Sequence, residues 1–377
     1  MKKIKILEAI RQGNFGGGES HLLDLVTHMD KSRFEPVVLS FTSGAMVDEM
    51  RRRGIKVKVI YTKRAFDFSV WKKIRDFIIE EQIDIVHAHG TRANSNVFWA
   101  AKRTKRPLIY TIHGWSFHID QKYPVRKIRE FSERFLTSLS DKVICVSKSN
   151  EQDGIKLFNM KRSTVIYNAV DLEKFSPYNN YKDIRQELGI SSDKTVVGYI
   201  VRITKQKDPL TMLKAMKKLD GYSDNNIVLL MVGDGELKDQ ALKLAKKLKI
   251  EDKVIFQPFR ADIPEVLNAI DIYCLPSLWE GFPIGILEAM AMKKAIVASP
   301  VDGTREMIKD GETGLFVNYG KPKDLAEALK FVSKDTAFRD MLARNAFKYV
   351  RENLGIASLV EDVQKLYKQL LVYRISV

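Results

Sequence analysis

Short runs of apolar, often β-branched residues alternate along almost the whole chain with longer stretches in which apolar residues recur at helical spacing. This alternation is typical of βαβ units and therefore of parallel sheets. In the front half it predicts strands at Ile4–Ile10, Pro36–Phe41, Val57–Tyr61, Ile85–Ala88, Leu108–His113, Val143–Val146 and Thr164–Tyr167. In the back half it predicts strands at Thr195–Val201, Ile227–Val232, Val254–Phe256, Ile272–Leu275, Ala295–Ala298 and Leu315–Val317. Each set suffices for one doubly wound sheet, so we expect an α/β protein with two Rossmann-like domains.

A polar, turn-rich segment without periodicity separates the two sets of strands. We therefore expect an N-terminal domain at residues 1–170, a linker at 171–182 and a C-terminal domain at 183–354. In the last segment, 355–377, Leu359, Val363, Leu366 and Leu370 share one face of a helix. Such an amphipathic helix needs a partner, so we expect it to return toward the N-terminal domain and pack on the body.

The composition of the 377 residues, 45% hydrophobic and 29% charged, is that of a globular protein and excludes a largely disordered chain. The longest stretch without a charged residue, Pro107 to Ile119, is shorter than the roughly 20 residues of a membrane-spanning helix. Because Glu8 interrupts the N-terminus before a signal-peptide core can form, we expect a cytoplasmic protein. Cys145 and Cys274 each lie in a strand-like run, which predicts buried thiols in a reducing compartment.

Positive charge is concentrated in the front half. The net charge is +16, of which residues 1–170 carry +13 and the remainder +3. Such a field attracts phosphates, although it could serve solubility alone. Basic and aromatic residues also interleave in two patches, one with Lys63, Arg64, Phe66, Phe68, Trp71, Lys72, Lys73 and Arg75, the other with Lys122, Tyr123, Arg126, Lys127, Arg129, Phe131, Arg134 and Phe135. This mixture suits an anionic membrane surface, and since no RNA-binding or zinc-finger signature accompanies it, we expect no nucleic-acid partner.

One carboxylate in an apolar helix is the most informative feature of the back half. From Ile284 to Met292 every residue is apolar or small except Glu288. Burying a carboxylate is costly unless it is hydrogen-bonded, so Glu288 needs a donor, either a protein arginine or a ligand diol. Glu280 lies in the loop leading into this helix, whose N-terminal N–H groups favour an anion such as phosphate.

Two cations follow the predicted buried strand Thr195–Val201, at the end of the strand where ligands of open α/β sheets bind. Arg202 and Lys207 could clamp one diphosphate there, or they could belong to a solvated basic loop. The next strand-to-helix turn, Gly233-Asp234-Gly235-Glu236, is interpreted as structural.

The front half offers its own candidates. Gly16-Gly17-Gly18 opens a helix after the first strand, where backbone N–H groups could contact a phosphate or a sugar. His113 ends a predicted strand and could contact a bound sugar, or serve as a core or capping residue. His87 and His89 have metal-like spacing, but no nearby cysteine or third histidine supports zinc, and the chain has no Asp-x-Asp pair. We therefore expect no metal site and no obligatory metal.

With these residues in place, the chain resembles, over essentially its full length, the retaining nucleotide-sugar glycosyltransferases with two facing Rossmann-like domains, the GT-B fold of family 4 type. The matching segments stand in family order: Gly16-Gly17-Gly18-Glu19, Asp84–Gly90, Thr111-Ile112-His113-Gly114, Val165–Asp171, Arg202…Lys207, Gly233–Glu236, Glu280…Glu288 and Gly311–Leu315. The chain departs from the family pattern at Ala169, Val201, Pro283 and Asp302, each of which replaces a usual glycine.

The resemblance implies a donor site in a cleft between the domains. It implies that Arg202 and Lys207 bind the donor diphosphate, that Glu288 binds the ribose, and that the loop amides at Pro283, Ile284, Gly285 and Ile286 surround phosphate and sugar. Glu280 and His113 would contact the transferred sugar, and Gly16, Gly17 and Gly18 would close over the donor.

The expected reaction moves a sugar, with retention, from a nucleotide-sugar, a UDP-sugar in our interpretation, to a lipid-linked or anionic glycan acceptor. No cofactor is expected, and the setting would be cell-surface polysaccharide or glycolipid synthesis at the inner face of the membrane. Two alternatives remain open: a basic nucleic-acid- or membrane-binding module without catalysis, and a sugar-nucleotide epimerase with the same two-Rossmann plan.

Overall fold

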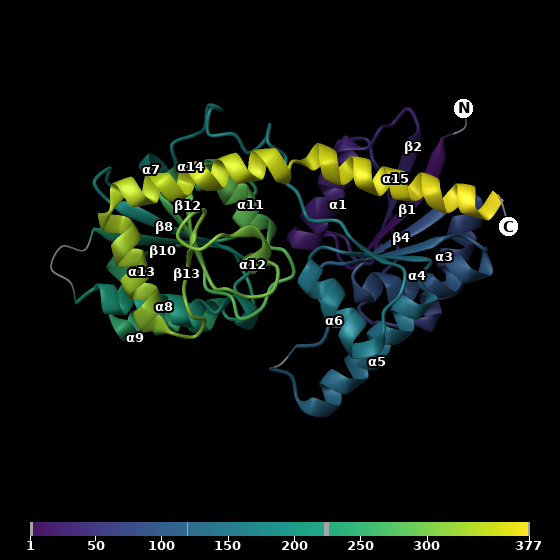
Figure 1. Cartoon of the computed structure of the whole chain (residues 1–377), viewed down its shortest axis with the longest axis horizontal. Helices are drawn as coiled ribbons and strands as arrows, with labels where there is room; N and C mark the ends of the chain where they lie inside the picture. The colour runs from purple at the N-terminus through teal and green to yellow at the C-terminus, as the bar shows by residue number, and fades with distance from the viewer. Residues whose placement is uncertain (1–2, 119, 222–225, 376–377) are drawn as a thin grey trace. The chain divides into compact units, whose positions relative to one another are not determined.

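The computed structural model describes residues 3–118, 120–221 and 226–375, which form two compact units. The first unit comprises the chain up to Ala169 together with the segment from Ile356, and the second unit runs from Val170 to Gly355. Each unit contains one parallel sheet with helices on both faces (Figure 1). The predicted α/β architecture with two Rossmann-like domains is therefore confirmed.

The first unit is built on a seven-stranded sheet of order β3-β2-β1-β4-β5-β6-β7. Its strands are β1 (Ile4–Ile10), β2 (Phe34–Ser40), β3 (Lys56–Val59), β4 (Ile85–His89), β5 (Leu108–Ile112), β6 (Lys142–Cys145) and β7 (Ser163–Val165). Its helices are α1 (Gly17–His28), α2 (Ala45–Arg52), α3 (Phe68–Glu80), α4 (Thr91–Arg103), α5 (Tyr123–Leu139), α6 (Lys148–Phe158) and α15 (Ile356–Ile375). The strand order reverses between β1 and β4, which is the topological switch point of a doubly wound sheet.

Side chains along each strand alternate between two helical layers. Leu7 and Ala9 of β1 face the core that contains α3 and α4, whereas Ile6 faces the core that contains α1 and α15. Because the period of a strand is two residues, Glu8 points to the same side as Ile6. In the parallel register of β1 and β4, Glu8 lies opposite His87. The alternation thus places polar side chains of neighbouring strands together beneath α1 and α15.

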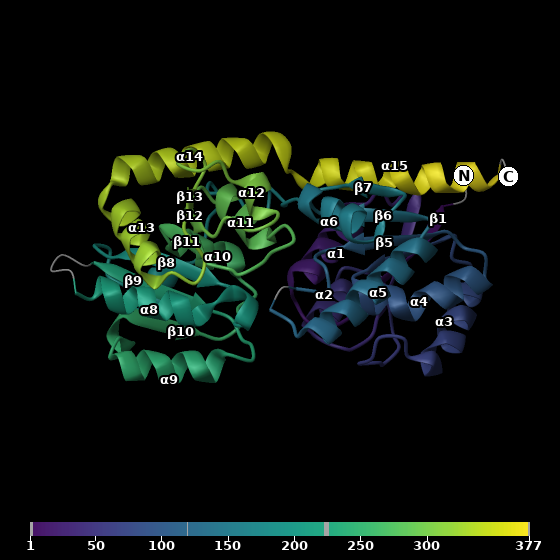
Figure 2. The ribbon, with the colours of Figure 1, turned by 60° about the horizontal axis from the view of Figure 1, so that its bottom comes forward.

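The C-terminal helix α15 packs on the first unit, as the sequence predicts. Leu359, Val363 and Tyr367 are 3%, 1% and 0% exposed and pack with Ile6 and Ile85 of the sheet. Figures 1 and 2 show α15, in yellow, lying along this face of the first unit. Residues 376 and 377 of the predicted C-terminal segment lie outside the described residues. Among the described helices, none combines the length and the hydropathy that crossing a lipid bilayer requires.

The second unit is built on a six-stranded sheet of order β10-β9-β8-β11-β12-β13, again reversing next to its first strand. Its strands are β8 (Thr195–Ile200), β9 (Ile227–Val232), β10 (Val254–Gln257), β11 (Ile272–Leu275), β12 (Ala295–Ala298) and β13 (Leu315–Phe316). Its helices are α7 (Ile184–Glu187), η1 (Lys205–Lys207), α8 (Pro209–Leu219), α9 (Lys238–Leu248), η2 (Glu251–Lys253), α10 (Ile263–Ala269), α11 (Ile284–Ala291), α12 (Thr304–Met307), α13 (Pro322–Lys334) and α14 (Thr336–Asn353).

Residues 171–182, which the sequence predicts to be a linker, lie within the second unit by this division. Phe175 is 2% exposed, and the Tyr181 hydroxyl donates a hydrogen bond to the Ser176 carbonyl at 2.8 Å. Two aromatic side chains therefore hold this segment in place, although its polar composition indicates an exposed linker.

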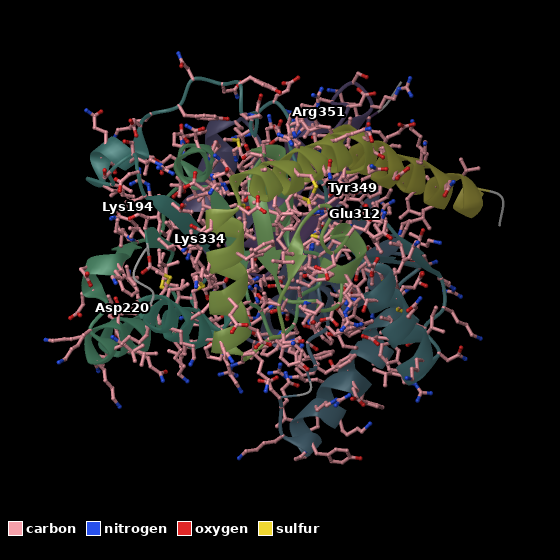
Figure 3. All side chains as sticks on the ribbon, turned by 60° about the vertical axis from the view of Figure 1, so that its left-hand side comes forward. Lys194, Asp220, Glu312, Lys334, Tyr349 and Arg351 are labelled. Carbon is pink, nitrogen blue, oxygen red and sulfur yellow. The ribbon has the colours of Figure 1, made fainter. Side chains whose placement is uncertain are left out.

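The turn that precedes β13 is braced by α14. The Asn345 side-chain amide donates to the Glu312 carbonyl at 3.0 Å, and Figure 3 labels Glu312 and, on α14, Tyr349 on this side of the second unit. Gly311, with φ of 73°, takes a left-handed conformation that glycine adopts without strain. The motif Gly311–Leu315 is thus explained here by turn geometry.

We predict that Leu359→Ala lowers the free energy of unfolding by about 2–5 kcal/mol, because it removes buried methyl groups and leaves a cavity under α15. Urea denaturation measures this loss. Glu361→Ala, at an exposed position of the same helix, is the matched control and should change stability by about 0.5 kcal/mol or less. Equal effects of the two substitutions would show that the helix does not pack as described.

Candidate functional site

The loop after β8 carries Arg202, which is exposed, and ends in η1. The turn after β9 packs directly on the backbone of this loop. A Cβ atom on Gly233 would lie 2.0 Å from the Val201 carbonyl oxygen, and one on Gly235 would lie 2.3 Å from the Ile203 carbonyl oxygen. Only glycine fits at these two positions, so the Gly-x-Gly turn supports the loop that presents Arg202.

Lys207 and Glu280, both predicted site residues, form an ion pair. The Lys207 Nζ and Glu280 Oε1 atoms are 2.5 Å apart, and the side chains are 18% and 5% exposed. Neighbouring contacts fix the same two loops together, because the Gln206 side chain donates to the Trp279 carbonyl at 2.8 Å and the Leu278 N–H donates to the Gln206 carbonyl at 2.8 Å. The cation after β8 and the acid before α11 therefore belong to one site.

Asp302 fixes the backbone of the loop that carries Glu280. Its φ of 34° lies in the left-handed region, and its Oδ2 accepts a hydrogen bond from the Glu280 N–H at 3.1 Å. Aspartate tolerates this region better than most residues, which explains how it stands where the resembling family has glycine. The following Gly303 is required by packing, since a Cβ atom there would lie 1.9 Å from the Gly281 carbonyl oxygen.

Helix α11 is buried as predicted, but Glu288 is not. The neighbouring Leu287 and Ala289 have no exposed surface, whereas Glu288 is half-buried. The expectation of a fully buried carboxylate is therefore corrected: the helix turns this one position partly toward solvent. A half-buried carboxylate keeps part of its hydration and can still receive a ligand hydroxyl.

The start of α11 limits which backbone amides can bind an anion. Pro283 precedes the helix and has no N–H, so the expectation that it donates is corrected. The Ile286 N–H donates to the Pro283 carbonyl at 3.2 Å. Ile284 and Gly285 are thus the amides of the predicted set that remain suited to an anion.

Tyr273 is a buried residue of this site that sequence reasoning missed. Its hydroxyl donates to the Ile200 carbonyl at 3.2 Å, and a Cβ atom on Gly285 would lie 2.3 Å from its oxygen. Burial, and then the negative charges of Glu288 and Glu280, raise the pKa of Tyr273 well above its ordinary value. Tyr273 therefore links the end of β8 to the first turn of α11 as a neutral phenol.

The first unit contains a second cluster, centred on Glu8. Its Oε2 is 2.9 Å from His89 Nε2, and its Oε1 accepts a hydrogen bond from the Tyr367 hydroxyl at 2.7 Å. His87 Nδ1 lies 2.7 Å from the Tyr367 hydroxyl oxygen, and His87 Nε2 lies 2.7 Å from Thr111 Oγ1. Glu8, His87 and His89 are all 0–1% exposed, so this network is sealed from solvent.

Burial governs the ionisation of this network. It raises the pKa of Glu8, but the charge of His87 and hydrogen bonds from His87 and His89 outweigh it and hold that pKa well below its ordinary value. Burial lowers the pKa of His89 to about 4 and, together with the charges of His89 and His87, the pKa of His21 to about 3. Burial and the neighbouring histidines also lower the pKa of His113 well below its ordinary value. At neutral pH the cluster therefore contains an ionised Glu8 and neutral rings at His21, His89 and His113.

His113 and the glycine loop, predicted separately, meet in the structure. A Cβ atom on Gly18 would lie 3.2 Å from His113 Cδ2, and the His21 ring stands edge-on to the His113 ring with centroids 4.8 Å apart. Gly17 begins α1, as expected, and Gly16 caps it in an extended conformation. The N-terminal turn of α1 thus forms one wall of the space beside His113.

The argument from sequence that no third histidine lies near His87 and His89 is wrong. One ring nitrogen from each of His21, His89 and His113 lies within 4.8 Å of the others. A carboxylate oxygen of Glu8 and ring nitrogens of His87 and His89 form a similar group. Helix α1 and the end of β5 bring together residues that lie far apart along the chain. That the protein needs no metal stays a prediction.

Sequence reasoning singled out His87, His89 and His113 but gave no site role to Glu8, His21 or Tyr367. The signal for Glu8 was available, because it is the one carboxylate inside the otherwise largely apolar strand β1. No comparable signal exists for Tyr367, which lies in a regular amphipathic helix.

Comparisons with known proteins cover both units. Residues 15–174 match the family described as Glycosyltransferase Family 4, and residues 180–349 match the family described as Glycosyl transferases group 1. The chain is 28% identical over 302 residues to the UDP-Gal:alpha-D-GlcNAc-diphosphoundecaprenol alpha-1,3-galactosyltransferase of Escherichia coli, covering 78% of this chain and 77% of that protein.

Solved structures show the same fold. The structure of Anabaena HepE in complex with UDP and glucose superimposes with a TM-score of 0.86 at 22% identity, over 97% of this chain and 100% of that chain. The same protein in complex with UDP-glucose gives a TM-score of 0.85 at 23% identity, over 97% of this chain and 100% of that chain. Together with the two sheets, these matches establish the GT-B fold.

We predict that stability falls as the pH is lowered below about 6.5. Between that value and their lowered pKa values, His21, His89 and His113 bind protons more readily in the unfolded chain than in the folded one. Each contributes a loss on the order of 1 kcal/mol between pH 7.5 and 5.5. Glu8, whose pKa is lowered, adds a further loss below its ordinary pKa of about 4.5.

Urea denaturation at a series of pH values measures this dependence. His21→Gln should flatten the curve, whereas His28→Gln, at an exposed histidine on the same helix, should leave it unchanged. A free energy of unfolding that rises on acidification would contradict the neutral cluster.

Proposed function

We propose that this chain transfers a sugar from a UDP-sugar to a lipid-linked or anionic glycan acceptor, with retention, because its residues 15–174 and 180–349 match Glycosyltransferase Family 4 and Glycosyl transferases group 1. The observation that carries the proposal is the tightly held Lys207–Glu280 pair, whose lysine follows the exposed Arg202 in the loop at the carboxyl end of β8. Open α/β sheets bind their ligands at this edge, next to the switch point.

Departure of a nucleoside diphosphate creates negative charge, and preorganised cations stabilise that charge better than water does. Lys207 is held in place by Glu280, so little reorganisation is needed when the diphosphate binds. Arg202 is exposed and can form a forked contact with phosphate oxygens. The Ile284 and Gly285 amides at the start of α11 offer further donors.

The half-buried Glu288 suits the ribose of the nucleotide, because a carboxylate can accept hydrogen bonds from both hydroxyls of a diol. The HepE structures with UDP and the name of the Escherichia coli relative support a UDP-sugar. Glu280, whose N–H donates to Asp302, is assigned to the transferred sugar, as is His113, which lies next to Gly18 of the Gly16–Gly18 loop.

In the proposed reaction the bond between the anomeric carbon and the diphosphate breaks, and a bond from an acceptor hydroxyl forms on the same face. The proton of that hydroxyl passes to the departing phosphate. Retention by front-face attack rests on the family resemblance and on Glu280 being engaged by Lys207 rather than placed as a nucleophile.

Helix α5 supports an acceptor at a membrane surface. Its exposed face carries Ile128 and Phe131, which are 70% and 72% exposed, and Tyr123, which is 73% exposed. Lys127 and Arg129 are exposed beside them. A helix with apolar and basic side chains on its outer face is typical of binding to an anionic lipid interface.

The inner face of α5 carries a buried acidic residue. Glu133 has no exposed surface and accepts hydrogen bonds from the Tyr110 hydroxyl at 2.8 Å and from Thr91 Oγ1 at 2.7 Å. The helix thus buries a carboxylate and presents apolar side chains to solvent, the reverse of an ordinary surface helix. With the diphosphoundecaprenol-linked acceptor named for the Escherichia coli relative, this supports a protein bound peripherally at the cytoplasmic face of the membrane.

The main test is release of UDP from UDP-sugars incubated with lipid-linked acceptors, read by mass spectrometry. We expect Lys207→Ala and Arg202→Ala each to lower turnover by about 10²-fold, because each removes one preorganised cation. Lys205→Ala, at an exposed position between them, is the matched control and should retain the wild-type rate.

EDTA should leave turnover unchanged. UDP release without acceptor-dependent product would indicate hydrolysis, and conversion of the UDP-sugar to its epimer without net UDP release would indicate the epimerase. Stabilisation by DNA or RNA, with none by UDP, would favour the basic module without catalysis.

A second prediction concerns membrane binding. Vesicles of phosphatidylglycerol and phosphatidylcholine should bind the wild-type protein, and replacement of Lys72, Lys73, Lys127 and Arg129 by alanine should weaken binding, since each charge contributes about 1 kcal/mol near such a surface. Ile128→Ser with Phe131→Ser should weaken it as well.

Phe331→Ser is the control, because this phenylalanine is 50% exposed but lies in the second unit. Unchanged vesicle binding in both the quadruple alanine variant and the Ile128→Ser, Phe131→Ser variant would remove the membrane assignment.

A further inference from the structure

A chain of hydrogen bonds in the first unit connects the buried carboxylate of Glu8 to His113. They link Tyr367 of α15, Glu8 of β1, His89 of β4 and His113 at the end of β5. We propose that Glu8 and His89 are positioning residues that hold His113 in the tautomer with an unprotonated Nδ1, so that His113 recognises a ligand by accepting a hydrogen bond from a hydroxyl. That the hydroxyl belongs to the transferred sugar rests on the proposed function; the tautomer does not.

Glu8 determines which atoms of the chain donate their hydrogen bonds and which accept them. An ionised carboxylate is an acceptor only, and Glu8 has no exposed surface through which water could reach it. Its Oε1 accepts from the Tyr367 hydroxyl, so its Oε2, 2.9 Å from His89 Nε2, must accept from that nitrogen. His89 therefore carries a proton on Nε2.

The protonation state of His89 in turn determines which nitrogen of His113 donates. With its pKa lowered to about 4, the ring is neutral at pH 7 and has one N–H group. Its Nδ1 is therefore an acceptor, and the atom 3.1 Å away, His113 Nε2, must donate. His87 makes its own contacts with Tyr367, with Thr111 and, at 3.2 Å between its Nδ1 and Oε2, with Glu8, and none of these contacts reaches His113.

His113 ends the relay with one unused acceptor. Its pKa is also lowered, so its second nitrogen, Nδ1, has a lone pair and no proton. This Nδ1 is buried and has no hydrogen-bond partner among the described residues. A buried acceptor without a partner is costly, and a sugar hydroxyl can satisfy it, whereas a phosphate oxygen, itself an acceptor, cannot.

The ring is also fixed in place. Gly18 packs against the Cδ2 edge of His113, where a Cβ atom would lie only 3.2 Å from Cδ2, and His21 stands edge-on to the ring. Rotation of the ring would break the bond to His89 and collide with α1. Position and tautomer are thus set by different contacts, the first by α1 and the second by Glu8 through His89.

The tautomer can be read directly from the intact protein. We would label the full chain with ¹⁵N-histidine and record long-range ¹H–¹⁵N spectra at pH 7 in the presence of EDTA. The chain has six histidines, and single substitutions assign their signals. We expect both His89 and His113 to carry their proton on Nε2. A proton on Nδ1 of His113, or a protonated ring, would overturn the proposal, as would a bound metal, which would have to displace the proton from Nε2.

A binding experiment separates positioning from folding. In His89→Phe, the His113 Nε2–H loses its acceptor, so the preference for UDP-glucose or UDP-galactose over UDP should fall by about tenfold, whereas the affinity for UDP itself should not change. His28→Phe, the same substitution at an exposed histidine, is the control and should preserve both affinities.

Loss of UDP affinity together with UDP-sugar affinity in His89→Phe would show a general structural defect and contradict a positioning role. If neither UDP-sugar binds the wild-type protein better than UDP, the proposed donor is wrong, and the spectra alone then decide the tautomer.

Discussion

The carboxylate of Glu8 is buried away from solvent, and its need for hydrogen-bond donors determines how several side chains of the first unit are arranged. Because a carboxylate cannot be left unpaired in a protein interior, every group around it must donate. Strand β4 supplies His89, and α15 supplies Tyr367. The requirement to satisfy one acid thus joins the middle of the sheet to the last helix of the chain and orients the side chain that ends β5.

The second unit solves a related problem with opposite charges. Lys207 and Glu280 neutralise each other at 2.5 Å, and the loop that carries Lys207 also carries the exposed Arg202. Asp302 accepts the Glu280 N–H from a left-handed conformation, and close backbone contacts at Gly233, Gly235 and Gly303 hold the surrounding loops. The charged groups are held in place because the loops that carry them are packed backbone against backbone.

The architecture could be predicted from the sequence because strand periodicity and turn residues are local signals. The proximity of Lys207 and Glu280 could be predicted in the same way, because both follow strands at the edge where parallel sheets bind ligands. The cluster around Glu8 could not be assembled in this way, since it depends on strand register and on the side of the sheet that α15 covers. Likewise, Phe175 and Tyr181 pack in a segment whose polar composition indicates a linker, because two aromatic side chains outweigh many solvated ones.

The position of α15 has a consequence for biosynthesis. The helix is made after the second unit, yet it covers a hydrophobic face of the first unit, which is made before the second. At roughly 5–20 residues per second, the ribosome needs about 10–40 s to translate the intervening second unit. Throughout that interval the nascent first unit exposes Ile6, Ile85 and Ile109 and lacks Tyr367, so the later-made unit can complete its core before the earlier one does.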